Sequence, residues 1–202
     1  MFTSGCIPVA ARANVVIHGS ILVGGTDDNT NIKQALTPML CESATLTALS
    51  AVDATWQTML NDDIDTLFDP EAANVLFITE TTNSVQTRTF AEIVEDVAAY
   101  TTARRAAHPE WRIVLITTMP RTQWPDDTED IDARNALITS VDEHFVRDCA
   151  SAGLDDVVSV KHCNSPFCTC DPSVWSGHLP NMVGYTLVAE QCCHALRRFV
   201  HM

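Results

Sequence analysis

A serine, an asparagine and a histidine stand in this sequence where each could take part in acyl transfer. Ser20 and Asn83 each follow an apolar run, and His178 lies in a loop before the last helical segment. A serine hydroxyl becomes a nucleophile when a base removes its proton, and histidine is the usual base. A side-chain amide and backbone N–H groups can stabilise the oxyanion that then forms. We therefore expect Ser20 to attack, His178 to take its proton, and Asn83 with the Ser20 backbone N–H to hold the oxyanion.

Five short apolar runs are the candidate strands that would position these residues. They are apolar on both alternating faces, which is typical of strands covered on both sides of a sheet. The expected strands are Ala13–His18, Thr45–Leu49, Ala73–Thr79, Arg112–Thr118 and Asp156–Val160. Ser20 follows the first of them and Asn83 follows the third.

Helical periodicity fills the segments between and after these runs. Apolar residues recur at spacings of three and four, as on the buried face of an amphipathic helix. Pro180 marks the start of the last helix. The expected helices are Asn31–Leu40, which Pro38 interrupts, Thr55–Phe68, Phe90–Arg105, Ala133–Ala150 and Asn181–Val200.

The alternation of strands and helices predicts an α/β fold with a mostly parallel sheet. Right-handed crossovers between five strands give a three-layer, flavodoxin-like domain: a five-stranded parallel sheet with helices on both faces. Ligands bind such sheets at the carboxyl ends of the strands. We expect residues 13–202 to form this single domain and residues 1–12 to form an N-terminal extension.

Four sequence blocks at the predicted strand ends resemble those of the SGNH (GDSL-type) hydrolases, which are esterases, lipases and carbohydrate deacetylases. ANVVIHGSIL resembles the first block, AVDATWQTML the second, VLFITETTNS the third and WSGHLPNMVGY the fifth. The resemblance covers about residues 13–200 in order and spacing. It implies that Ser20 is the nucleophile, Asn83 an oxyanion donor and His178 the base.

The blocks also depart from the family pattern. Gly19 stands where the family has an aspartate before the serine. Asp53 and Ala54 stand where it has an oxyanion glycine, so a backbone N–H of Ala54 or a neighbour would have to serve. The third block reads TTNS over 81–84, where the family has glycine-x-asparagine-aspartate.

The fifth block lacks the acid of the expected catalytic triad. Trp175 occupies the position before His178 at which the family has an aspartate, and an indole cannot stabilise an imidazolium as a carboxylate does. Asp171 is the nearest acidic candidate in sequence, and Glu80 could approach from the third strand. A backbone carbonyl could orient His178 instead, which would leave a Ser–His dyad.

Eight cysteines is a high number for a chain of 202 residues. Cys163, Cys168 and Cys170 form a group that is compatible with a disulfide, a zinc site or free thiols. Its spacing matches no common zinc module, so we expect a disulfide and no metal. Adjacent residues of a helix point to different faces, so at most one of Cys192 and Cys193 is expected to face the core.

Composition restricts the partners of the chain. The net charge of −14, from 26 acidic and 12 basic residues, repels phosphate backbones and anionic lipids, so no nucleic-acid partner is expected. No run approaches the roughly 18 apolar residues of a membrane-spanning helix. The N-terminus lacks the features of an ordinary signal peptide. The cysteines and the N-terminal extension nevertheless favour an extracellular or virion-associated protein, in which the extension contributes to a larger assembly.

The sequence supports two functions of different classes. The first is a serine esterase or deacetylase that cleaves an O-acetyl or short acyl ester of a small molecule or carbohydrate and needs no cofactor. The second is a binding or structural module that retains the fold with weakened or lost catalysis, as the departures in the blocks suggest. The joint retention of Ser20, Asn83 and His178 favours the enzyme.

Overall fold

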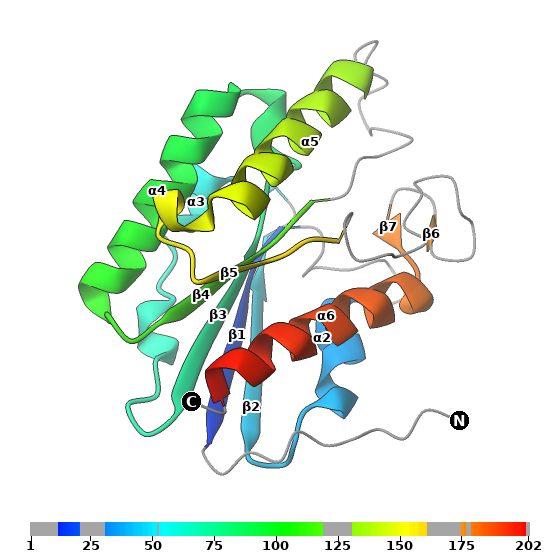
Figure 1. Ribbon diagram of the computed structural model, residues 1–202. Helices are drawn as coiled ribbons and strands as arrows, with labels where there is room; N and C mark the ends of the chain where they lie inside the picture. The colour runs from blue at the N-terminus through cyan, green and yellow to red at the C-terminus, as the bar shows by residue number, and fades with distance from the viewer. Residues whose placement is uncertain are drawn as a thin grey trace.

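A five-stranded parallel sheet lies at the centre of the computed structural model (Figure 1). The structure describes residues 12–20, 31–51, 53–118, 131–160, 175–176 and 179–200. The strands lie in the order β2-β1-β3-β4-β5, and every neighbouring pair is parallel. The predicted flavodoxin-like sheet is therefore confirmed. Its strands are β1 (Ala13–Gly19), β2 (Ala44–Ser50), β3 (Ala73–Thr79), β4 (Arg112–Ile116) and β5 (Asp156–Val158).

Helices cover both faces of the sheet, as predicted (Figure 1). One face packs against α2 (Ile32–Leu36) and α6 (Met182–Val200). The other packs against α3 (Trp56–Met59), α4 (Phe90–Ala107) and α5 (Ile131–Arg147). Short 3₁₀ helices adjoin these elements: η1 (Thr37–Met39), η2 (Asp65–Leu67), η3 (Ser84–Gln86) and η4 (Cys149–Ala152).

The hydrophobic core consists of two layers separated by the sheet. Successive residues of a strand point to opposite faces. In β1, Val15 and Ile17 pack with α2 and α6, whereas Val16 packs with the helices of the other face. Because both layers exclude water, the central strands β1, β3 and β4 are mostly apolar, and this pattern is what made them recognisable in the sequence. The edge strand β2 alternates threonine with apolar residues and is only partly buried.

The predicted helix over Thr55–Phe68 is wrong in its length. Thr55 caps α3, but the helix ends after one turn and the chain resumes as η2. Between the two elements, Asp62 makes a 2.9 Å contact through its Oδ2 with Nε2 of His18 in β1. Ile64 still reaches the core and is 0% exposed, so the apolar spacing was informative about burial although not about a continuous helix.

The predicted helix over Asn31–Leu40 is divided in a similar way. Asn31 caps α2 by accepting a hydrogen bond from the Gln34 N–H at 3.0 Å. Pro38 lies within the first turn of η1. The chain changes from an α-helix to a 3₁₀ helix here, because proline has no N–H to donate to an α-helical hydrogen bond. The predicted interruption by Pro38 is therefore confirmed.

Both cysteines of the adjacent pair in α6 are buried, which corrects the expectation that at most one would be. Cys192 is 0% exposed and Cys193 is 7% exposed. Cys193 lies 3.9 Å from the sulfur of Met39, because α2 and η1 cover this side of α6. Cys41 and Cys149 are also free thiols. The group of Cys163, Cys168 and Cys170 lies outside the described residues.

The described residues contain neither a membrane-spanning helix nor a metal-binding cluster. No helix there is long and apolar enough to cross a membrane. The same residues contain no group of three or more histidine, cysteine or acidic side chains arranged to hold a metal ion.

Candidate active site

Ser20 follows the carboxyl end of β1 and is almost completely buried, with 2% of its surface exposed. Its backbone N–H donates to the carbonyl oxygen of Thr79, the last residue of β3, at 3.2 Å. In a sheet of this strand order, the connections change direction between β1 and β3, and ligands bind at such a switch point. Ser20 therefore lies where a substrate site is expected.

Asn83 follows β3 and stands at the start of η3. Its Nδ2 donates to the carbonyl oxygen of Ala54 at 2.8 Å. Ala54 lies in the segment after β2, so this bond joins the segments that follow β2 and β3, the two strands on either side of β1. A side-chain amide carries two N–H hydrogens, and the bond to Ala54 fixes the direction of both.

Glu80 lies between the strand end and Asn83 and is 1% exposed. Its Oε1 accepts the backbone N–H groups of Asn83 at 2.7 Å and of Ser84 at 3.3 Å. Its Oε2 accepts the hydroxyl of Ser84 at 2.5 Å. Burial raises the pKa of the Glu80 carboxyl to about 7, although the hydrogen bonds from Ser84, Asn83 and Trp56 favour the charged form.

Solved structures share this arrangement of sheet and helices. A GDSL-like lipase from Bacteroides thetaiotaomicron matches with a TM-score of 0.73 and 15% identity, over 93% of this chain and 89% of that chain. A lipolytic protein of the G-D-S-L family from Veillonella parvula matches with a TM-score of 0.72 and 16% identity, over 92% and 99%. The chain has the SGNH hydrolase fold.

A third similar structure is an inhibitor-bound aryl esterase from M. smegmatis, with a TM-score of 0.71 and 11% identity, over 93% of this chain and 99% of that chain. No known family model matches the sequence, and no curated protein sequence matches it either. The resemblance to the SGNH fold is therefore carried by three-dimensional structure far more than by residue identity.

The two backbone donors expected to complete an SGNH oxyanion hole are bonded elsewhere. The Ser20 N–H donates to Thr79, as described above, and the Ala54 N–H donates to the Ala51 carbonyl at 3.1 Å in a turn. The expectation was that the Ser20 N–H and an N–H from Ala54 or a neighbour would hold the oxyanion, and it is wrong for the Ser20 and Ala54 groups. Ala54 contributes its carbonyl oxygen to the site instead, as the acceptor that orients Asn83. Asn83 is then the candidate oxyanion donor among the described residues.

Gly19 accounts for one departure from the SGNH sequence pattern. A Cβ atom at Gly19 would lie 2.2 Å from the carbonyl oxygen of Thr79 and 2.7 Å from the Thr79 side chain. Neither distance is compatible with a side chain unless β1 and β3 move apart. The aspartate of the family pattern would therefore not fit between these two strands.

His18, two residues before Ser20, belongs to the support of the site. It is 1% exposed, and its Nδ1 lies 2.7 Å from the Tyr100 hydroxyl while its Nε2 lies 2.9 Å from Asp62. Burial lowers the pKa of His18, although Asp62 opposes the shift. A neutral ring that donates from Nε2 to the carboxylate and accepts the Tyr100 hydroxyl at Nδ1 satisfies all three groups.

Two predicted site residues, Asp171 and His178, lie outside the described residues, and their roles stay predictions. The described strands β6 (Trp175–Ser176) and β7 (Leu179–Pro180) precede and follow His178 and pair in an antiparallel manner. Asn181 then caps α6, accepting the Gly184 N–H at 3.1 Å.

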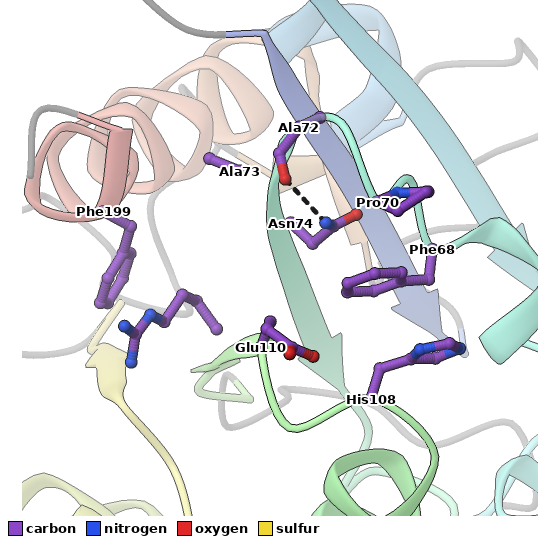
Figure 2. A pocket seen from close by; sticks show the side chains of 9 residues that line it. Phe68, Pro70, Ala72, Ala73, Asn74, His108, Glu110 and Phe199 are labelled. Atoms are coloured by element: carbon purple, nitrogen blue, oxygen red, sulfur yellow. Dashed lines mark hydrogen bonds between the residues drawn. The ribbon is translucent and has the colours of Figure 1, made fainter.

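A cavity of about 510 Å³ lies at the opposite end of the sheet (Figure 2). It adjoins the first residues of β3 and β4 and the end of α6, and His108 stacks on Phe68 there with ring centroids 4.1 Å apart. Because Ser20 and Asn83 follow the carboxyl ends of their strands, this cavity is not part of the candidate active site. Its lining residues are Phe68, Pro70, Ala72, Ala73, Asn74, His108, Glu110, Arg112 and Phe199.

Sequence reasoning missed two features of the site. The bonds from the two Glu80 oxygens to the 83–84 segment of its own loop were not anticipated, and a contact between Glu80 and His178 stays a prediction. The pairing of His18 with Asp62 was not anticipated. The position of Glu80 directly after a buried strand was the available signal for its hydrogen bonds, because a buried carboxylate must find donors nearby.

Proposed function

We propose that this protein is a serine ester hydrolase that removes an O-acetyl or short acyl group from a small molecule or carbohydrate. The observation that carries the proposal is the placement of Ser20 and Asn83 at the ends of β1 and β3, at the switch point of the sheet. Its support from the comparisons is coarser: the similar structures include a lipase and an aryl esterase.

In the proposed reaction, the Ser20 hydroxyl attacks the ester carbonyl while His178 accepts its proton. The carbonyl oxygen becomes an oxyanion, to which the Asn83 amide donates a hydrogen bond. Collapse of this intermediate breaks the bond to the alcohol, which leaves with the proton from His178. Water then attacks the acyl group on Ser20 by the same sequence and releases the acid. Asp171 or a backbone carbonyl orients His178.

A second candidate function is favoured by the bonds of the Ser20 and Ala54 N–H groups. Loss of one oxyanion donor lowers kcat by about 10²–10³ in serine hydrolases. A site in which two backbone donors are engaged elsewhere therefore suits a binding or structural module with weak or absent catalysis.

Hydrolysis of p-nitrophenyl acetate by the wild type and by Ser20→Ala separates the two functions. The hydrolase proposal expects Ser20→Ala to lower kcat by about 10³ or more. Ser140→Ala is the matched control, because Ser140 lies on α5 and bonds only the Ala136 carbonyl of its own helix. Labelling by a fluorophosphonate should map to Ser20. A wild type no faster than Ser20→Ala, with no label on Ser20, would reject the hydrolase in favour of the module.

A further inference from the structure

The Glu80 carboxylate is a buried group in the described part of the site to which the proposed reaction gives no role. It lies directly after β3 and is 1% exposed. No charged side chain in the described residues contributes to the shift of its pKa, which has burial as its largest cause. A buried carboxylate without a cationic partner is costly to retain, so its hydrogen bonds must account for its presence.

Three of those hydrogen bonds hold the segment that carries Asn83. Oε1 accepts the Asn83 and Ser84 N–H groups, and Oε2 accepts the Ser84 hydroxyl. The Ser84 hydroxyl oxygen in turn lies 3.4 Å from the Trp56 backbone N–H, at the start of α3. Glu80 therefore links η3 to the segment whose Ala54 carbonyl orients the Asn83 amide.

We propose that Glu80 is a positioning residue for the oxyanion-binding amide of Asn83, acting through the backbone N–H of Asn83 and through Ser84. This inference rests on the proposed hydrolase function. Both ends of Asn83 are then held: its backbone N–H by the Glu80 carboxylate, and its side-chain amide by the Ala54 carbonyl. Because the Ser20 and Ala54 N–H groups are engaged elsewhere, Asn83 is the oxyanion donor among the described residues, and its position affects the oxyanion stabilisation.

The departure at position 84 supports this role. The third block of the family has an aspartate after the asparagine, and this chain has Ser84 there. The hydroxyl of Ser84 contacts the Glu80 carboxylate at 2.5 Å, so a carboxylate occupies the neighbourhood of position 84 although it comes from position 80.

The closing experiment compares Glu80→Gln with the wild type. Glutamine keeps the size of the side chain but replaces one acceptor oxygen by a donor, which cannot accept the Ser84 hydroxyl. We expect kcat to fall by about 10–100-fold with KM within about twofold, because the loss concerns the transition state. Adding Ser84→Asp to Glu80→Gln should recover most of this loss by returning a carboxylate to the same place.

Asp148→Asn is the matched control. Like Glu80, Asp148 accepts a backbone N–H near the start of a 3₁₀ helix: it accepts the Ser151 N–H of η4 at 3.3 Å. Asp148 follows α5 and lies on the surface, away from the candidate site. Its amide variant should keep the wild-type kcat. A Glu80→Gln variant that is folded and has the wild-type kcat would overturn the proposal, as would a loss that appears in KM alone.

A second measurement does not depend on activity. In the wild type, the NMR signal of the Asn83 backbone amide proton should titrate with a midpoint near pH 7, as the Glu80 carboxyl that it binds changes charge. Glu80→Gln should abolish this titration. Its absence in the wild type would overturn the inference. Titration in a wild type that hydrolyses no ester would reject the proposed function and with it the catalytic purpose of the Glu80–Asn83 bond.

Discussion

Two asparagines hold backbone groups at opposite ends of the sheet, and their surroundings differ. At the amino end, Asn74 donates to the Asp69 carbonyl at 2.7 Å and to the Ala72 carbonyl at 2.8 Å, and Figure 2 shows the second of these bonds. Its Oδ1 accepts the Asn14 amide at 2.8 Å and the Asp69 N–H at 2.9 Å. At the carboxyl end, Asn83 donates to Ala54 and is anchored through a buried carboxylate.

The difference concerns titratable groups. The cluster around Asn74 consists of amide and backbone groups that satisfy one another, which is what structural stability requires. The carboxyl end instead buries His18 and Glu80, each 1% exposed, and the pKa of each is displaced by burial. Buried groups with displaced pKa values concentrate at functional sites. The comparison therefore supports the proposed function, in which the carboxyl end carries the chemistry and the amino end contributes stability.

Asn83→Ala gives the largest effect expected from this comparison. With the Ser20 and Ala54 N–H groups bonded elsewhere, removal of the Asn83 amide should lower kcat for p-nitrophenyl acetate by about 10²–10³. Asn61→Ala is the matched control, because Asn61 also donates from Nδ2 to a backbone carbonyl, that of Gln57, but is exposed in the turn after α3. Equal rates for the two variants would remove Asn83 from the site.

Gly19→Ala tests how closely β1 and β3 must approach beside the site. The added Cβ would meet the Thr79 carbonyl oxygen at 2.2 Å, and backbone cannot move aside as a flexible side chain can. We expect the free energy of unfolding to fall by about 3 kcal/mol or more, as measured by urea denaturation. A variant as stable as the wild type would show that the two strands separate easily at this point.

The strands of the fold could be predicted closely from the sequence, because burial on both faces leaves a continuous apolar run. β3 has the predicted bounds, Ala73–Thr79. β4 was expected to reach Thr118 and ends at Ile116. Beyond Ile116, side chains also make hydrogen bonds to the neighbouring segment: the Thr117 hydroxyl accepts the Val160 N–H at 2.9 Å. A hydrogen bond of this kind leaves no pattern in the local sequence.

The candidate site could be predicted only in its outline. The positions of Ser20 and Asn83 after β1 and β3 follow from the strand pattern and the topology. The acceptors of the Ser20 and Ala54 N–H groups do not, because they depend on how two chain segments meet in space. The direction of the Glu80 carboxylate likewise depended on donors in η3 that helical periodicity could not identify.

Glu80 should make stability depend on pH in an unusual direction. Its pKa rises from about 4.5 in the unfolded chain to about 7 in the fold, so the folded protein binds more protons between these values. Stability from this group is complete below pH 4.5 and is lost as the pH rises through 7, by on the order of 3 kcal/mol. Relative to the wild type, Glu80→Gln should therefore gain unfolding free energy between pH 4.5 and 8. A constant difference would contradict the raised pKa.

Asn74→Ala is the counterpart of Asn83→Ala at the amino end. It leaves the Asp69 N–H and one bond of the Asn14 amide without their acceptor, which should lower the free energy of unfolding by about 2 kcal/mol. Activity at a temperature where the variant is folded should equal that of the wild type. A fall in kcat without loss of stability would break the division between the two ends of the sheet.

Tyr100→Phe should have the smallest effect, and it tests the neutral state of His18. The Tyr100 hydroxyl lies 2.7 Å from Nδ1 and donates to it only while that nitrogen carries no proton. Removal of this hydroxyl should cost about 1 kcal/mol of unfolding free energy at pH 7.5. Because the pKa of His18 is lowered in the fold, the stability from its neutral ring is present above pH 6.5 and is lost as the pH falls. The difference between Tyr100→Phe and the wild type should therefore shrink as the pH falls through the lowered pKa of His18 in the fold. A difference that stays constant after NMR shows the folded His18 ring to be protonated would mean that the hydroxyl does not select the neutral ring.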